Sequence, residues 1–137
     1  MTPKEYLQRY HTAKREAQDL ELRITRLRLK YAFPSAIQCS DMPKAHDSNR
    51  DLSDYMVKLD DLENYLVEKY CQCVGIESDI LHRLDAMEVQ AEREVLRYRY
   101  IDGMTWEKIA STLSYDLRHI YRIHGNALQH FPLPECH

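Results

Sequence analysis

Glycine and long apolar runs are both scarce in this chain, and each shortage excludes a class of protein. Only 3 of the 137 residues are glycine, which favours long helices with few turns and leaves no glycine-rich loop for holding phosphates. No apolar run approaches the length needed to cross a bilayer, and the polar first residues are unlike a signal peptide. Neither a nucleophile elbow nor a catalytic triad pattern is present. We therefore expect a cytoplasmic, all-α protein that is not an enzyme and needs no cofactor.

The chain has four cysteines: Cys39, Cys71, Cys73 and Cys136. In a reducing compartment they are expected to be free thiols. Residues two apart on a helix point to nearly opposite sides, so Cys71 and Cys73 are not expected to hold one metal ion together. One alternative is the magnesium-binding helix of an all-α nucleotide pyrophosphatase, formed by Asp60, Asp61, Glu63, Glu68 and Glu77. Their spacing lacks the paired glutamates of such enzymes, so we interpret them as a solvated face.

The net charge of −3 conceals a strong asymmetry along the chain. Residues 1–31 contain eight Lys and Arg against four Asp and Glu, whereas residues 32–91 contain five against twelve. Residues 92–137 contain six of each. A basic segment beside an acidic one predicts that the two pair with each other.

Two long helices are predicted from apolar residues that recur at alternating spacings of three and four, as in a coiled-coil seam. Thr2 and Glu5 form a capping box around Pro3, which begins the first helix. Its seam residues are Tyr6, Tyr10, Ala13, Ala17, Leu20, Ile24, Leu27 and Tyr31. Pro34 ends it, and residues 32–49 form a connection. The second helix spans about 50–86, with seam residues Leu52, Tyr55, Leu59, Leu62, Leu66, Cys73, Ile76 and Ile80. We expect an antiparallel hairpin over residues 1–86.

The periodicity changes in the last third of the chain, where three shorter helices are predicted over 88–101, 106–113 and 117–130. Thr105 and Asp116 are placed to cap the second and third of these. A helix-turn-helix needs apolar residues where its two helices cross and a small residue at their closest approach. The crossing residues are Ile109, Leu113, Ile120 and Ile123, with Ala110 as the small one. Ser114 occupies the turn position that is commonly glycine. Residues 87–137 are therefore predicted to be a helix-turn-helix domain.

In such a domain the third helix would enter the major groove of DNA with its N-terminal residues leading. The candidate base-reading residues are Leu117, Arg118, His119, Tyr121 and Arg122. Either arginine has the fork that matches guanine, while His119 and Tyr121 suit phosphates or a thymine methyl. Lys108 and Arg99 are expected to contact the DNA backbone without reading sequence. His124 is expected to face solvent or a phosphate, and Trp106 to pack.

The run EVLRYRYIDGMTWEKIA at 94–110 resembles region 4 of sigma factors, in which a helix rich in Glu and Arg leads into the DNA-binding pair. The opening TPKEYL, the DMPKAH segment at 41–46 and the ending RIHGNAL at 122–128 are similar to small prophage proteins of Gram-positive bacteria. These in turn are similar to the ArpU and RinA families of phage late-gene regulators. That resemblance implies promoter binding and control of packaging or late genes in a bacterial host, at the nucleoid when DNA is bound.

Two functions from different classes are consistent with the sequence. The first is a DNA-binding transcriptional regulator that acts on double-stranded DNA. The second is a coiled-coil interaction protein that docks on RNA polymerase or another regulator without reading DNA sequence. A homodimer is expected in either case, because Met56, Tyr70, Val74 and Leu81 leave an apolar flank beside the seam.

Overall fold

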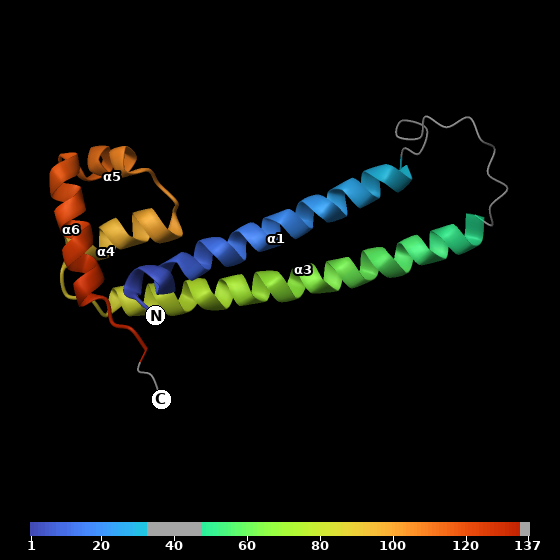
Figure 1. Cartoon of the computed structure of the whole chain (residues 1–137), viewed down its shortest axis with the longest axis horizontal. Coiled ribbons are helices and arrows are strands. Elements are labelled where there is room, and N and C mark those ends of the chain that lie inside the picture. Colours follow the sequence, from blue (N-terminus) through green and yellow to red (C-terminus); the bar gives the residue numbers. More distant parts are fainter. Residues whose placement is uncertain (33–47, 135–137) are drawn as a thin grey trace. The chain divides into compact units, whose positions relative to one another are not determined.

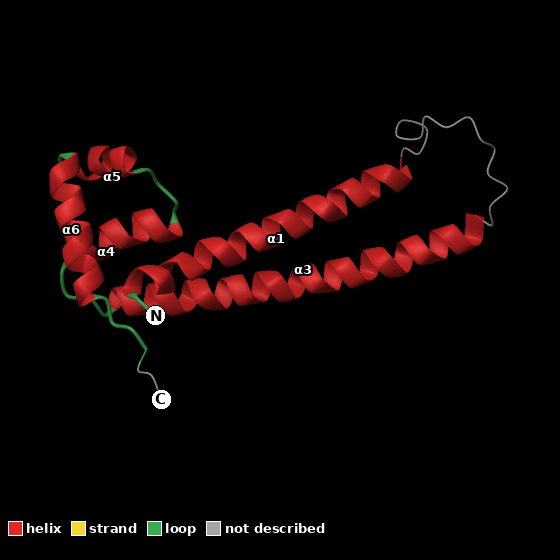
Figure 2. Cartoon of the chain, viewed as in Figure 1, coloured by secondary structure: helices red, strands yellow, loops and turns green. Residues whose placement is uncertain are grey.

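The computed structural model describes residues 1–32 and 48–134, and within these ranges the regular secondary structure is helical, without a strand (Figure 2). The predicted all-α fold is confirmed. The elements in chain order are α1 (Pro3–Ala32), α3 (Ser48–Asp85), α4 (Gln90–Leu96), the π-helix η1 (Arg97–Ile101), α5 (Trp106–Leu113) and α6 (Leu117–His130) (Figure 1). Pro34, Cys39, Cys136 and most of the predicted 32–49 connection lie outside the described residues.

The chain divides into two compact units. Unit 1 comprises Met1–Lys14 and Gln72–His137, and unit 2 comprises Arg15–Cys71. This division differs from the expected boundary between 86 and 87. The difference has a physical reason, because the first turns of α1 and the last turns of α3 share one apolar cluster with α4, η1 and α6. Whether 87–137 is a domain in the functional sense stays a prediction.

In unit 2, α1 and α3 lie side by side (Figure 1) and run antiparallel, since the residue numbers of contacting partners rise on one helix as they fall on the other. Glu21 accepts a hydrogen bond from the Tyr70 hydroxyl at 2.6 Å. Further along, Arg28 pairs with Glu63, and the rings of Tyr31 and Tyr55 stack with centroids 4.1 Å apart. These contacts repeat along both helices and hold their partners in one register.

The predicted charge pairing between the two helices is only partly observed. Arg28 of α1 with Glu63 of α3 has the expected polarity, but Glu16 and Lys69, 3.3 Å apart, have the opposite one. Since all four side chains are at least partly exposed, such pairs contribute only about 0–1 kcal/mol each. Apolar burial therefore matters more than charge in this unit.

Burial along the predicted seam is unequal. Ala17, Leu20 and Ile24 of α1 are buried, whereas the seam residues of α3 in unit 2 are only half-buried: Tyr55, Leu59, Leu62 and Leu66. Two predicted seam residues are wrong as core positions, because Tyr31 is 44% and Leu52 is 56% exposed. A layer of only two helices leaves part of its seam facing solvent, and in unit 2 that part lies mainly on α3.

Unit 1 has two apolar clusters. The first joins the start of α1 and the end of α3 to the later helices: Tyr6, Leu7, Tyr10, Ala13, Cys73, Ile80, Leu84, Met87, Leu96, Tyr100, Ile101, Ala127 and Phe131. The second lies where α5 crosses α6 and α4: Val95, Ile109, Ala110, Ile120 and Ile123. Leu81 packs against the first cluster, so its expected place on an exposed flank is wrong. Val74 is exposed as expected.

The predicted capping box of α1 is confirmed. The Thr2 amide donates to the Glu5 carboxylate at 2.8 Å, and the Glu5 amide donates to Thr2 Oγ1 at 3.2 Å. The bond from the Thr2 amide lowers the pKa of the Glu5 carboxyl. Cys71 and Cys73 are free thiols. The first is exposed and the second is buried, as expected for residues that point to nearly opposite sides of a helix.

The helix predicted over 88–101 is shorter at its start and changes type within its length. It begins as α4 at Gln90 and continues as the π-helix η1 over Arg97–Ile101. The wider turn is closed by the Asp102 amide, which donates to the Arg97 carbonyl five residues earlier at 3.0 Å. Gly103 follows with φ of +69°, a conformation that favours glycine. A π-helix carries one extra residue per turn and rotates the residues after it, and its pattern cannot be distinguished from an α-helix in sequence.

Candidate nucleic-acid interface

The pair α5 and α6 is formed by local signals at each end. The Thr105 hydroxyl accepts a hydrogen bond from the Lys108 amide at 3.2 Å and caps α5. The Asp116 carboxylate accepts from the His119 amide at 3.2 Å and caps α6. Each cap satisfies an amide that would otherwise lack a partner at the start of the helix. The predicted bounds of both helices are confirmed.

The turn between these helices closes through Ser114, which has φ of 60° and ψ of 38°. The Tyr115 amide donates to the Ala110 carbonyl at 3.0 Å, and the Ser114 amide donates to the Ser111 carbonyl at 3.3 Å. This pair of bonds is a Schellman motif, in which a left-handed residue ends one helix and turns the chain sharply. Ser114 is the only non-glycine residue with a positive φ in the described part of the chain.

The residues predicted to pack at the helix crossing do so. Ile109 and Ile120 have no exposed surface, and Ala110 and Ile123 are also buried. Leu113 is half-buried against the same cluster. A small side chain at position 110 lets the backbones of α5 and α6 approach closely. The crossing therefore fixes which face of α6 points to solvent.

The solvent face of α6 carries most of the predicted DNA-reading residues. Arg118, Tyr121 and Arg122 are exposed, and Leu117 is 36% exposed at the start of the helix. His119 is half-buried, with its ring 4.7 Å from the Tyr115 ring in an edge-on contact. Tyr121 meets the Trp106 ring edge-on at 5.4 Å. The face is thus basic and aromatic, with the two arginines one helical turn apart.

Lys108 and Arg99, the two residues predicted to contact the DNA backbone, differ in whether their side chains are free to do so. Lys108 is exposed on α5. The Arg99 side chain is half-buried and already occupied, because its Nη1 donates to the Met104 carbonyl at 3.1 Å and its guanidinium lies 4.4 Å from the Trp106 ring centre. These contacts give Arg99 a role in holding the loop before α5. Nothing in the sequence signalled this role.

His124 does not face solvent, and that expectation is wrong. Its Nε2 lies 2.8 Å from the Tyr100 hydroxyl, and its ring meets Trp106 edge-on at 4.7 Å. Burial lowers the pKa of His124, and the positive charges of Lys4 and Arg99 lower it further. Burial likewise raises the pKa of Tyr100. Trp106 therefore packs, as expected, and supports α6 from beneath its exposed face.

The last turn of α6 is tied to α4 by a contact between a carboxylate and an imidazole that sequence analysis missed. Glu92 is 7% exposed, and its two carboxylate oxygens lie 2.9 and 3.0 Å from His130 Nδ1. A buried carboxylate without such a partner would be costly. The two residues are 38 positions apart, so no local pattern could have found the pair.

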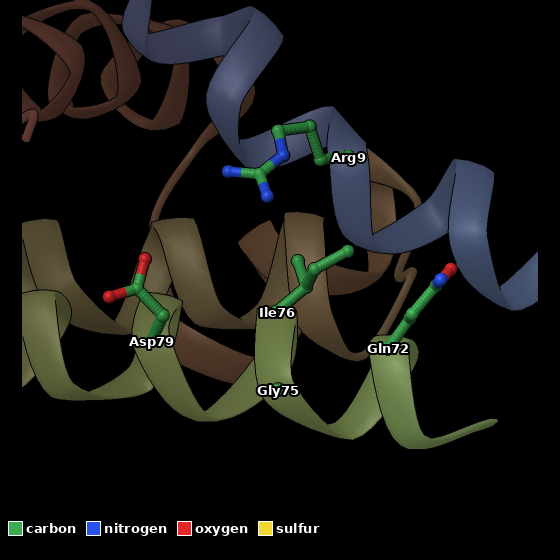
Figure 3. Close-up of a pocket in the computed structure, with 5 residues that line it drawn as sticks. All are labelled: Arg9, Gln72, Gly75, Ile76 and Asp79. Atoms are coloured by element: carbon green, nitrogen blue, oxygen red, sulfur yellow. The ribbon is translucent and has the colours of Figure 1, made fainter. Parts of the chain in front are cut away.

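A groove of about 440 Å³ lies elsewhere in unit 1. Figure 3 shows its lining, with Arg9 from α1 and four residues of α3: Gln72, Gly75, Ile76 and Asp79. Both charged groups are engaged within the protein, because Arg9 stacks 4.9 Å from the Tyr6 ring centre and Asp79 pairs with Arg83 at 3.2 Å. The groove therefore adds no binding group to the interface on α6.

Comparison of the chain with protein-family models, curated proteins and solved structures finds no match. None of the helices in the described ranges is long and apolar enough to span a membrane. Among the same residues, no group of three or more His, Cys, Asp and Glu side chains is placed to hold a metal ion.

Proposed function

We propose that this chain is a sequence-specific DNA-binding transcriptional regulator that reads double-stranded DNA with α6. The observation that carries the proposal is the α5–α6 pair, in which two capped helices joined by a tight left-handed turn cross over a buried contact. This is the geometry that a helix-turn-helix requires, with its second helix free to enter a major groove. The resemblance of 94–110 to sigma region 4 supports the same role and suggests late or packaging genes of a phage as targets.

The side chains on the exposed face of α6 suit base recognition. Arg118 and Arg122 lie on one face at the N-terminal half of the helix, where base edges are met. A bidentate contact from one arginine to guanine O6 and N7 discriminates against other bases by about 1–3 kcal/mol. Exposed Tyr121 and Leu117 offer apolar surface for a thymine methyl.

Backbone contacts would be few. Lys108 is exposed on α5, but Arg99 is engaged by Met104 and Trp106. A small number of phosphate contacts gives weak nonspecific binding and a shallow dependence on salt. Arg118 and Arg122 would therefore provide most of the discrimination between DNA sequences, and the affinity for scrambled DNA would be low.

The test begins with selection of duplexes from a random-sequence library by the purified full chain. Fluorescence anisotropy then compares an enriched duplex with a scrambled one across a salt series. Arg118→Ala or Arg122→Ala should lower the ratio of the two affinities by roughly 5- to 150-fold, which corresponds to about 1–3 kcal/mol. Lys108→Ala should weaken both duplexes alike and reduce the salt slope by about one.

Arg97→Ala is the matched control, because it removes the same charge from an exposed position of η1 rather than from α6. It should leave the affinity ratio unchanged. Circular dichroism verifies that each variant is folded. If no sequence is enriched, or if both α6 variants bind the two duplexes as the parent does, α6 does not read DNA.

The exposed aromatic and apolar residues near the start of α6 favour a second candidate function. Tyr115, Leu117 and Tyr121 would equally suit a protein surface, so the alternative is docking on RNA polymerase without reading sequence. Retention of purified polymerase by the immobilised parent, and its loss with Tyr121→Ala in the absence of any enriched DNA, would establish this alternative.

A further inference from the structure

A stripe of apolar side chains lies exposed along α3 in unit 2. Leu52 is 56%, Met56 55% and Val67 62% exposed. Tyr70 adds its ring, 37% exposed, while its hydroxyl donates to Glu21. Successive members are separated by 4, 11 and 3 residues, and such spacings keep side chains within about 60° of one another round a helix. The stripe is therefore one face of α3, which begins at the exposed seam residue Leu52 and otherwise lies beside the seam.

This face is symmetric about Glu63. Met56 precedes Glu63 by seven residues and Tyr70 follows it by seven, and half-buried Leu59 and exposed Val67 lie four residues before and after it. If two copies of α3 cross antiparallel with Glu63 at a two-fold axis, Met56 meets Tyr70 of the second copy and Leu59 meets Val67 of the second copy. An interface between identical subunits about a two-fold axis requires this self-complementarity.

The charges at the centre of the stripe also fit a second copy. Two Glu63 carboxylates at the axis would repel each other, but each is paired with Arg28 of α1, and both partners remain about half exposed. Across the axis the two guanidinium groups would alternate with the two carboxylates. We propose that the chain forms a homodimer through antiparallel pairing of this α3 stripe, with Glu63 at its centre.

The chain offers a closely matched pair of variants for testing the dimer. Val67 and Val57 are 62% and 60% exposed on the same helix, but Val57 lies about 120° from Glu63 round the helix and off the stripe. Sedimentation velocity at tens of micromolar should give a dimer for the parent and for Val57→Glu. Val67→Glu should be monomeric, with a dimer affinity at least ~10-fold weaker and unchanged helical circular dichroism.

Cross-linking tests the antiparallel register in a chain whose four native cysteines are replaced. Oxidation should link two copies of Glu63→Cys, whereas Met56→Cys should not link to itself, because it faces position 70. A monomeric parent, a Val67→Glu dimer as strong as that of Val57→Glu, or self-linking of Met56→Cys would each overturn the proposal. None of these variants alters α5 or α6, so a failure of DNA binding would leave the results unaffected.

Discussion

Replacing Ser114 by glycine should stabilise the protein, although it removes a side chain. Ser114 holds a left-handed conformation, with φ of 60°, which costs a non-glycine residue about 1–2 kcal/mol. Glycine avoids that cost but loses more backbone entropy on folding, which offsets about 0.5–1 kcal/mol. The net expectation for Ser114→Gly is a gain of about 0.5–1 kcal/mol in the free energy of unfolding. For a unit the size of unit 1, that gain raises the thermal midpoint by about 2–8 °C.

Ser111→Gly is the matched control, because it makes the same substitution at an exposed helical position of α5, three residues earlier. There glycine has no conformational advantage and should lower stability by about 0.5 kcal/mol. Thermal unfolding followed by circular dichroism compares both variants with the parent. The two midpoints should move in opposite directions. If Ser114→Gly leaves the midpoint unchanged or lowers it, the turn does not have the left-handed geometry described here.

Two further predictions concern burial. Ile24→Asp places a carboxylate where the side chain is 3% exposed, and it should cost at least about 3 kcal/mol with loss of the helical signal from unit 2. The control Leu22→Asp, at a 48% exposed position, should leave that signal intact. Equal losses in the two variants would mean that Ile24 is not in the seam. The pKa of His124 is lowered on folding from its usual 6.5, so the unfolded chain binds this proton more readily than the folded chain. The contribution of His124 to stability should therefore be constant above about pH 6.5 and fall as the pH decreases below it. His124→Gln should remove this part of the pH dependence, which urea unfolding of the parent and the variant at a series of pH values would measure. If the urea midpoints of both proteins fall equally below pH 6.5, His124 is not the cause.

Much of the secondary structure could be predicted because its signals are local. The caps at Thr2, Thr105 and Asp116 each act within three residues of the amide that they satisfy, so the starts of α1, α5 and α6 were predictable from sequence. The crossing of α5 and α6 was predictable for a similar reason, since the periodicity of a short helix determines which residues share its buried face. The proposed DNA-reading residues follow from the same periodicity.

The surroundings of several polar side chains depend on contacts between residues far apart in the chain, which local sequence patterns could not predict. The partnership of Glu92 with His130 and the enclosure of His124 by Tyr100 and Trp106 join residues 18 to 38 positions apart. Arg99 was expected at a phosphate, yet the wider turn of η1 and the loop after it bring the guanidinium to Met104 and Trp106.

The apolar period of the two long helices, by itself, determined that Ala17, Leu20 and Ile24 would be buried in unit 2. It could not determine that Leu52, which continues the same period, would stay 56% exposed, or that Leu81 would be partly buried against the first cluster of unit 1. Periodicity specifies the direction in which a side chain points from its helix, because that depends only on the local backbone. Whether anything lies in that direction depends on how far neighbouring elements extend, which is a property of the tertiary structure alone.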